Sequence, residues 1–260
     1  FGCSDDEESL TTSEPQLTYI PNDFFENKLI LQGLDDIMDN YVLTENISTI
    51  EEFYFSVRTS DEDINTIDFT GVEDFTSLKF LGIYYTYCTN FIPDDDTCYS
   101  STIEDVYIEN FDISTLIDLE EIQMGIGAVN TYFENFNLSN NINLKILEVG
   151  FNSQYFILDS TLDLSNNVNL ELLTIMPQYA SSPGDGFLAE INLTNHPNLS
   201  YIALENNNLS ELDVSNCNQE SLTVYASGNN LSCVEVSQNQ IDNGVIVYGG
   251  VGVQILTSCD

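Results

Sequence analysis

Residues 199–209 read LSYIALENNNL, a stretch that follows the pattern L-x-x-L-x-L-x-x-N-x-L. Ile202 and Leu204 would point to the same side of a short strand, because strand side chains alternate. The amide of Asn207 can bond backbone groups where the chain turns away from that strand. One copy cannot bury its own apolar stripe, so the pattern predicts stacked copies that share one continuous core.

The same pattern occurs along most of the chain. Further copies run through Leu78, Leu81 and Ile83; Leu119, Ile122 and Met124; Leu144, Leu147, Val149 and Asn152; Leu170, Leu173 and Ile175; and Val224, Ala226, Asn229 and Leu231. A second apolar element precedes these copies and includes Ile67 and Phe69, Val106 and Ile108, Phe136 and Leu138, Leu162 and Leu164, Ile191 and Leu193, and Leu212 and Val214. Self-similarity at a regular period is typical of solenoids, and a set of unrelated strands with asparagine-rich turns is the alternative.

The repeats predict one elongated domain with capped ends. We expect an anchor and acidic tether at residues 1–19, an N-terminal cap at 20–63, repeats over 64–232 with insertions near 87–102 and 178–187, and a C-terminal cap at 233–260. Pro21 with Asn22 or Asp23 can begin a helix, and Gly33 is a natural end for it. Such a helix would cover the end of the core, which terminal repeats need for solubility.

Two segments resemble the leucine-rich repeat family, in particular the short-repeat proteins of Bacteroidota. They are LSELDVSNCN at residues 209–218 and IPNDFFENKLILQGLDDIMDNYVLTENIST at residues 20–49. The resemblance implies a right-handed solenoid with a parallel sheet on its concave face, an irregular or extended convex side and an N-terminal helical cap. It also implies a binding function, and it supplies no catalytic residues.

The N-terminus, FGCSDDEESL, resembles the end of a bacterial lipoprotein signal. Cys3 would then carry the lipid, and the acidic residues after it resemble the signal that sends Bacteroidota lipoproteins to the outer face of the outer membrane. Phe1 and Gly2 precede Cys3, although cleavage of such a signal would remove them. The alternative is an acidic N-terminus with an unrelated cysteine. No apolar run of about 20 residues occurs in the sequence, so we expect no membrane-spanning helix.

The other cysteines favour an oxidising compartment. Cys88 and Cys98 flank a short loop within an interruption of the repeats. Cys233 and Cys259 bracket the last segment, as paired cysteines do at the C-terminal cap of similar family members. We therefore expect these two disulfides, with Cys217 as a small, semi-buried free thiol in a turn.

The charge of the chain restricts its partners. Four cations, Lys28, Arg58, Lys79 and Lys145, oppose 43 acidic residues, and the formal net charge is −39. Binding of nucleic acid requires cations that neutralise phosphates, so nucleic acid is excluded as a partner. Electrostatic adhesion to an anionic membrane is disfavoured for the same reason, and contact with a membrane would depend on the lipid alone.

The sequence offers little for catalysis or for a cofactor. His196 is the one histidine, and we interpret it as a surface turn residue rather than a general base. The chain has no histidine cluster for zinc and no glycine-rich phosphate loop, so we expect no enzyme activity. Calcium is the one metal that the acidic clusters favour, because it prefers oxygen ligands. The clusters are Asp94, Asp95 and Asp96, and Asp35, Asp36 and Asp39, for which a solvated acidic loop is the alternative.

The residues between the buried leucines are expected to face outward on the concave sheet. The predicted ligand-binding residues are Phe80, Tyr84, Tyr85, Ile126, Ile146, Phe151, Leu172, Met176, Tyr201 and Tyr225. A solvated sheet face usually carries polar residues, and a contiguous apolar patch often marks a binding site. Alternatively, the insertions at residues 87–102 or 178–187 fold over this face and bury it.

These observations favour a non-enzymatic surface lipoprotein that binds a protein, a peptide or a glycan. An accessory role in an outer-membrane uptake complex follows by analogy with similar lipoproteins. The alternative is a permanent structural subunit of an outer-membrane assembly, which would bury the same face against its neighbours. An exposed aromatic groove on the purified chain favours ligand binding, and a chain that is insoluble without its partner favours the structural role.

Overall fold

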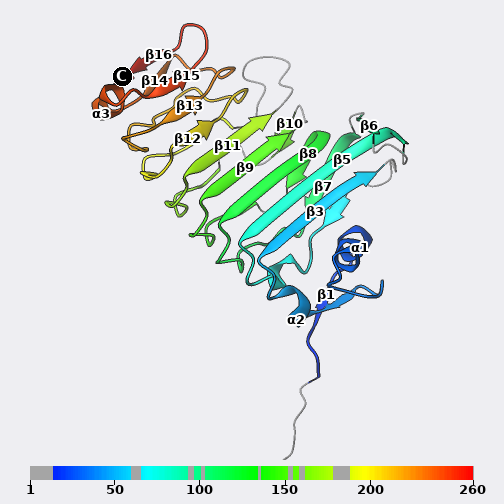
Figure 1. Cartoon of the computed structure of the whole chain (residues 1–260). Helices are drawn as coiled ribbons and strands as arrows, with labels where there is room; N and C mark the ends of the chain where they lie inside the picture. Colours follow the sequence, from blue (N-terminus) through cyan, green and yellow to red (C-terminus); the bar gives the residue numbers. More distant parts are fainter. Residues whose placement is uncertain are drawn as a thin grey trace, which may run out of the picture.

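The computed structural model describes residues 14–59, 66–92, 97–100, 103–133, 136–151, 155–157, 162–177 and 188–259. Its main feature is a sheet of 12 strands, of which eight follow one another in the order β15-β13-β12-β11-β9-β8-β5-β3. These eight are β3 (Glu52–Thr59), β5 (Phe80–Ile92), β8 (Glu121–Phe133), β9 (Ile146–Phe151), β11 (Leu172–Pro177), β12 (Tyr201–Ala203), β13 (Thr223–Tyr225) and β15 (Ile246–Tyr248). They lie side by side along the long axis of the molecule (Figure 1).

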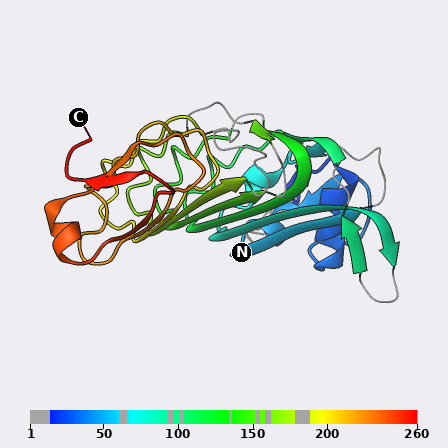
Figure 2. The same ribbon diagram turned by 90° about the horizontal axis from the view of Figure 1, so that it is seen from above.

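The smaller elements lie around this series of strands. They are β1 (Leu17–Tyr19), β2 (Tyr41–Leu43), β4 (Thr66–Asp68), β6 (Thr97–Ser100), β7 (Ile103–Glu109), β10 (Tyr155–Ile157), β14 (Cys233–Glu235) and β16 (Gln254–Leu256), the helices α1 (Asp23–Leu31), α2 (Thr44–Ile47) and α3 (Gln238–Asp242), and the 3-10 turn η1 (Val72–Asp74). The main strands form one side of the molecule, and mostly irregular segments form the other (Figure 2).

The parallel register places equivalent repeat positions next to one another. Ile122 pairs with Leu147, Leu147 with Leu173, Leu173 with Ile202, and Ile202 with Val224. All five side chains are buried in one apolar cluster that runs through the solenoid. The stripe of each copy is therefore buried by its neighbours, which is the arrangement predicted for a leucine-rich repeat solenoid.

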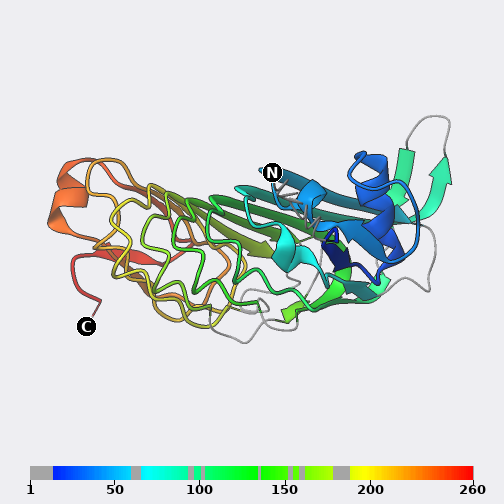
Figure 3. The same ribbon diagram turned by 90° about the horizontal axis from the view of Figure 1, so that it is seen from below.

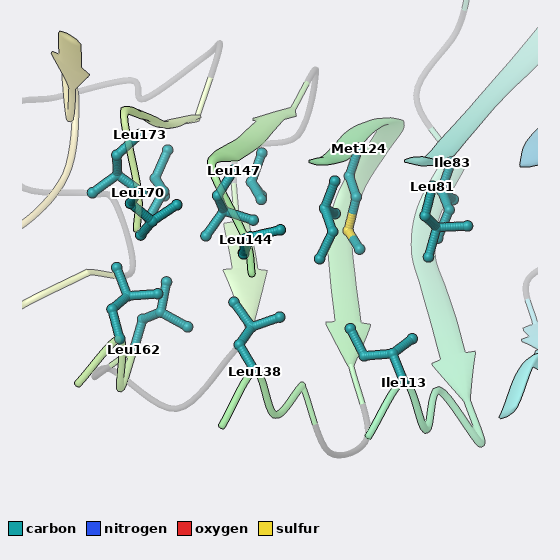
Figure 4. Packing of buried hydrophobic residues seen from close by; sticks show 14 of the residues in the cluster. Leu81, Ile83, Ile113, Met124, Leu138, Leu144, Leu147, Leu162, Leu170 and Leu173 are labelled. Carbon is teal, nitrogen blue, oxygen red and sulfur yellow. The ribbon is translucent and has the colours of Figure 1, made fainter. Parts of the chain in front are cut away.

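The second apolar element of each repeat supplies the opposite wall of this core. Ile113, Leu138 and Leu162 face the strand leucines across the interior (Figure 4). Each element then turns at an aspartate or asparagine whose side chain accepts a hydrogen bond from a backbone N–H two residues later. The acceptors are Asp112, Asn137, Asp163, Asn192 and Asp213, and the donors are Ser114, Ser139, Ser165, Thr194 and Ser215. This short side chain thus sets the turn in each of these copies.

A column of buried side chains, four of them polar, connects successive coils. We call it the amide column, and it comprises Asn141, Asn167, His196, Cys217 and Gln240. Asn167 Nδ2 donates to the carbonyl oxygens of Leu138 and Asn141, at 3.0 and 2.9 Å, in the preceding coil. Gln240 Nε2 donates likewise to the Val214 oxygen at 2.8 Å. The column therefore satisfies carbonyl groups that the turns leave without a partner inside the core.

The asparagine of the repeat pattern has a similar role beside the strands. Asn207 Nδ2 donates to the oxygens of Ile175 and Leu204, at 2.8 and 3.1 Å. Asn229 Nδ2 donates to the oxygens of Leu204 and Ala226, at 2.7 and 2.9 Å. The prediction that this amide bonds the backbone at the turn is confirmed at both positions.

Opposite charges alternate along the edge where the strands begin. The order across five successive coils is Glu51, Lys79, Glu120, Lys145 and Glu171, and each backbone N–H after the first bonds the carbonyl of the preceding member of this series. Lys79 Nζ lies 2.8 Å from Glu51 Oε1, and Lys145 Nζ lies 2.6 Å from Glu120 Oε2. Two of the four cations of the chain therefore neutralise acids at this edge.

Both ends of the solenoid carry additional elements (Figures 1 and 3). Helix α1 begins where Asn22 accepts a hydrogen bond from the Phe25 N–H, and Gly33 follows it with a positive φ of 74°. Phe25 packs against four aromatic rings of the first coils, Phe53, Phe55, Phe69 and Phe75.

At the other end, Cys233 and Cys259 form a disulfide that spans 26 residues, which confirms this predicted bridge. The side chains of Cys88 and Cys98 lie outside the described residues, so their bridge stays a prediction. Cys217 is free and buried, and burial raises its pKa to about 12.

We predict that Asn167→Ala lowers the free energy of unfolding by about 1–3 kcal/mol, because the buried carbonyl groups of Leu138 and Asn141 lose a donor. The change is measured by urea denaturation. Asn195→Ala, at an exposed position of the next turn, is the control and should change stability by less than about 0.5 kcal/mol. Equal effects of the two substitutions would contradict the role of the amide column.

Candidate binding surface

We define the sheet face as the strand side chains that alternate with the core residues and point away from the core. The register arranges them in three rows. The first row is Glu52, Phe80, Glu121, Ile146, Leu172, Tyr201, Thr223 and Ile246; the second is Tyr54, Gly82, Gln123, Glu148, Thr174, Ala203, Tyr225 and Tyr248; the third is Ser56, Tyr84, Gly125, Gly150 and Met176. Each row crosses the strands at nearly a right angle, so neighbours in a row are about 5 Å apart.

Most of the predicted ligand-binding residues lie on this face. They are Phe80, Tyr84, Ile146, Leu172, Met176, Tyr201 and Tyr225, and all are half-buried or exposed. Two of the predictions are wrong, because Tyr85 and Ile126 are 0% and 1% exposed and belong to the core. Consecutive strand residues point to opposite sides, so Tyr84 and Tyr85 cannot both face outward. The side chain of Phe151 lies outside the described residues.

Two further tyrosines, Tyr54 and Tyr248, lie on the face and were not predicted from the sequence. Their strands, β3 and β15, flank the recognisable copies and lack the full leucine pattern. The alternation of Phe53, Tyr54 and Phe55 in β3 is the signal that would have identified an outward tyrosine.

Three neighbouring tyrosine rings, one from the first row and two from the second, lie on the C-terminal half of the face. The ring centroids of Tyr201 and Tyr225 are 5.6 Å apart. Those of Tyr225 and Tyr248 are 4.8 Å apart, with an angle of 13° between the rings. We call these three residues the tyrosine ladder. Tyr201 and Tyr248 are 38% and 52% exposed, and burial, followed by the neighbouring Tyr225 and Glu205, raises the pKa of Tyr201.

A second aromatic group occupies the N-terminal half. The ring centroids of Tyr54 and Phe80 are 4.6 Å apart. The Tyr84 hydroxyl donates to Gln123 Oε1 at 2.6 Å, and Gln123 Nε2 donates to Glu121 Oε1 at 2.7 Å. These bonds hold Tyr84 in one orientation, so both halves of the face present fixed rings.

All the charged residues in the three rows are acidic. They are Glu52, Glu121 and Glu148, and Glu205 follows β12 at the same face with its Oε1 bonded by the Ser227 hydroxyl at 2.8 Å. Lys79 and Lys145 begin their coils at the sheet edge and are paired there with other acids. The face therefore combines aromatic rings with negative charge.

The described strand of the first insertion, β6, does not pair over the three rows of the face. Phe80–Thr86 of β5 pairs with β8, whereas Cys88–Ile92 pairs with β6 in an antiparallel hairpin. The hairpin thus extends from the far end of β5, as Figure 1 shows at the upper right. Residues 178–187, the second insertion, lie outside the described residues.

His196 is not the surface residue that the sequence suggested. Its side chain is 1% exposed, and Nε2 lies 3.1 Å from the Leu164 carbonyl oxygen within the amide column. Burial lowers the pKa of the imidazole. The ring therefore faces the interior, away from the sheet face, and its role is structural.

The described residues contain no cluster of three or more histidine, cysteine or acidic side chains suited to a metal ion. Asp94, Asp95 and Asp96 lie outside those residues, so calcium binding there stays a prediction. Asp35 and Asp39 accept hydrogen bonds from the backbone of Asp36 and Tyr41 and shape the loop after α1. Among the described helices, none is long and apolar enough to cross a membrane.

Comparison with known proteins gives distant similarities only. No family model and no curated protein matches the chain. Among solved structures, the functional domain of InlJ of Listeria monocytogenes, described as including a cysteine ladder, is 15% identical with a TM-score of 0.42, over 87% of this chain and 53% of that one. Internalin C2 of the same organism is 12% identical with a TM-score of 0.44, over 91% of this chain and 94% of that one. InlF, also from Listeria monocytogenes, is 12% identical with a TM-score of 0.25, over 93% and 96% of the two chains.

We predict that His196 makes the protein sensitive to acid. In the unfolded chain the imidazole takes up a proton below about pH 6.5, whereas burial lowers the pKa of the folded imidazole, which takes up its proton only at a lower pH. The unfolded state then binds more protons, so this contribution to stability is lost as the pH falls below that value, by up to about 1.4 kcal/mol per pH unit. Urea denaturation at about pH 7 and at about pH 5, on either side of the unfolded-state pKa, measures the loss.

The reference protein for this experiment is His196→Asn. This variant carries asparagine at position 196, the residue type found at the equivalent positions Asn141 and Asn167 of the column. The carboxylates titrate equally in both proteins, so the difference between the two slopes reports His196 alone. Parallel pH profiles for the wild type and the variant would contradict the prediction.

Proposed function

We propose that this chain is a non-enzymatic binding module that presents its sheet face to a protein or peptide partner. The observation that carries the proposal is the exposed tyrosine ladder on β12, β13 and β15. Tyrosine supplies a large contact area with little rotamer entropy to lose, and it is enriched at interface hot spots. The paired strands hold the rings in place before binding, which lowers the entropic cost of association.

The arrangement of the rings favours a polypeptide over a glycan. Tyr225 and Tyr248 stack on each other, so the ring faces between them are already covered. Sugar rings bind aromatic side chains through their faces, whereas the edges and hydroxyl groups of this ladder are what remain for a partner. Hydroxyl groups beside apolar ring edges suit the mixed surface of a peptide.

We further propose that the protein is held at the outer face of an outer membrane through a lipid on Cys3. The acidic segment after Cys3 and the expected disulfides support export. An accessory role beside an outer-membrane transporter is consistent with such a position. Cys3 itself lies outside the described residues.

A second function, that of a permanent subunit in a larger assembly, is favoured by the last coil. Ile246, Val251, Ile255 and Leu256 are exposed there by 48%, 109%, 43% and 40%. Several neighbouring exposed apolar residues are typical of surfaces that become buried in a complex. This arrangement would use the end of the solenoid rather than the tyrosine ladder.

We predict that replacing both Tyr201 and Tyr225 with alanine abolishes most binding at the sheet face. A random-peptide display library is selected on the wild-type chain, and the affinities of the selected peptides are measured by fluorescence anisotropy. The double variant should bind them about 30-fold more weakly, which corresponds to about 2 kcal/mol. Its melting temperature should change little, because no core leucine is altered.

Tyr107→Ala is the matched control. Tyr107 is also a partly exposed tyrosine with a stacked neighbour, Tyr132 at 4.7 Å, but it lies on β7, outside the three rows. It should leave peptide affinity unchanged. Peptides that bind the double variant as well as the wild type would show that the sheet face is not the binding surface.

The lipid anchor is tested by Cys3→Ala in the native host. The substitution should release the protein from the membrane fraction, because the lipid is the expected membrane contact of so acidic a chain. Immunoblots of the separated fractions measure the release. Membrane association that persists in the variant would contradict the anchor.

A further inference from the structure

The third row of the sheet face contains a gap. Gly125 and Gly150 are paired neighbours on β8 and β9, so two adjacent positions of the face have no side chain. Tyr84 precedes them on β5, and Met176 follows them on β11. Strands are about 4.8 Å apart, so the two flanking residues are separated by three spacings, or about 14 Å along the sheet.

The two glycine positions differ in the space above them. A Cβ atom built on Gly125 would lie 3.2 Å from Cδ1 of Tyr84, so the tyrosine ring leans over this residue. Among the described residues, a Cβ atom built on Gly150 meets no heavy atom within 4 Å. The opening therefore lies over Gly150, with the Tyr84 ring on one side and the Met176 side chain on the other.

A carboxylate borders this opening. Glu148 belongs to the second row, two residues before Gly150 on the same strand, and therefore points to the same side of the sheet. No described side chain donates a hydrogen bond to it or forms an ion pair with it. Its strand, β9, lies two strands from β5, which carries Tyr84, and two strands from β12, which carries Tyr201, so its negative charge lies between the two aromatic groups.

The described side chains supply no counter-charge at this place. None of the residues in the three rows is a cation, and Lys145, which begins the same coil as Glu148, is bound to Glu120 at the sheet edge. With a net charge of −39 the protein attracts cations over a long range. A partner that covers this half-buried carboxylate would strip its water, so a positive charge from that partner would compensate the loss.

We infer that the opening over Gly150 receives a lysine or arginine side chain of the protein partner, with its charged group on Glu148. The aliphatic part of that side chain would pack between Tyr84 and Met176, since lysine and arginine bury their stems along apolar surfaces. The inference rests on the proposed function and specifies its partner: an extended, cationic segment that also contacts the tyrosine ladder. A single carboxylate is too few ligands for a calcium ion.

The test uses the peptides selected on the wild-type chain. They should share a lysine or arginine at a constant position. Glu148→Gln should weaken their binding about tenfold. Glu190→Gln removes the same charge at an exposed position outside the three rows and should weaken binding less than about twofold at the same salt concentration.

Two further measurements locate the cation. Replacing the shared arginine of a peptide by the neutral citrulline should weaken its binding to the wild type by the same tenfold. The replacement should not weaken binding to Glu148→Gln any further, because the two changes remove the same interaction. Gly150→Leu should block the opening. The backbone φ of Gly150 is not positive, and the described residues leave room for a leucine side chain there, so the melting temperature of the variant should stay unchanged.

The outcomes separate this inference from the proposed function. Selected peptides that need Tyr201 and Tyr225 but carry no shared cation would overturn the inference and leave the binding face intact. Equal losses of peptide affinity for Glu148→Gln and Glu190→Gln would show that Glu148 acts only through long-range charge. This result would also overturn the inference. Peptides that depend on neither the ladder nor Glu148 would overturn both proposals.

Discussion

The in-register stacking of successive coils is the constraint on which the rest of the structure depends. Parallel backbone pairing brings each residue next to the equivalent residue of the neighbouring coil, so every position becomes a column through the molecule. Leucine and isoleucine columns form the core. A polar residue in a column lies next to the equivalent polar residue of the neighbouring coil, so the two must be able to bond. Asparagine meets this condition because each amide donates to a carbonyl group of the coil before it. Charged columns must alternate in sign, as Glu51, Lys79, Glu120, Lys145 and Glu171 do.

The sheet face is free of the demands that determine the core. Its residues project from strands whose pairing and packing are already complete, so their identity affects stability less than that of the leucines. The same columns that align core residues also align the face, where they stack Tyr225 on Tyr248 and place Gly125 beside Gly150. A rigid surface with rings, an opening and negative charge follows from the repeat, and the proposed binding function rests on this combination.

Much of the fold is predictable because the repeat pattern states the period directly. The positions of the buried strand leucines, the backbone bonds of Asn207 and the Cys233–Cys259 bridge all follow from spacing or from the resemblance. The errors came where the strand alternation was not extended beyond the leucine pattern, and at a turn. Tyr85 and Ile126 continue the inward side of long strands, where burial decides their place. His196 sits in a turn that looks exposed in the sequence, but stacking buries the same turn position at Asn141 and Asn167 as well.

The sequence by itself determined the period, the core and the acidic character of this protein, since these depend on residue spacing and composition. Only the tertiary structure decided which side chains meet across strands. Contacts such as Tyr225 with Tyr248, Tyr84 with Gln123 and the opening over Gly150 depend on the lateral register between coils. That register is set by hydrogen bonds between segments one structural repeat apart, about 20–45 residues along the chain. A shift of one residue would turn every face residue into the core, because strand side chains alternate between the two sides of the sheet.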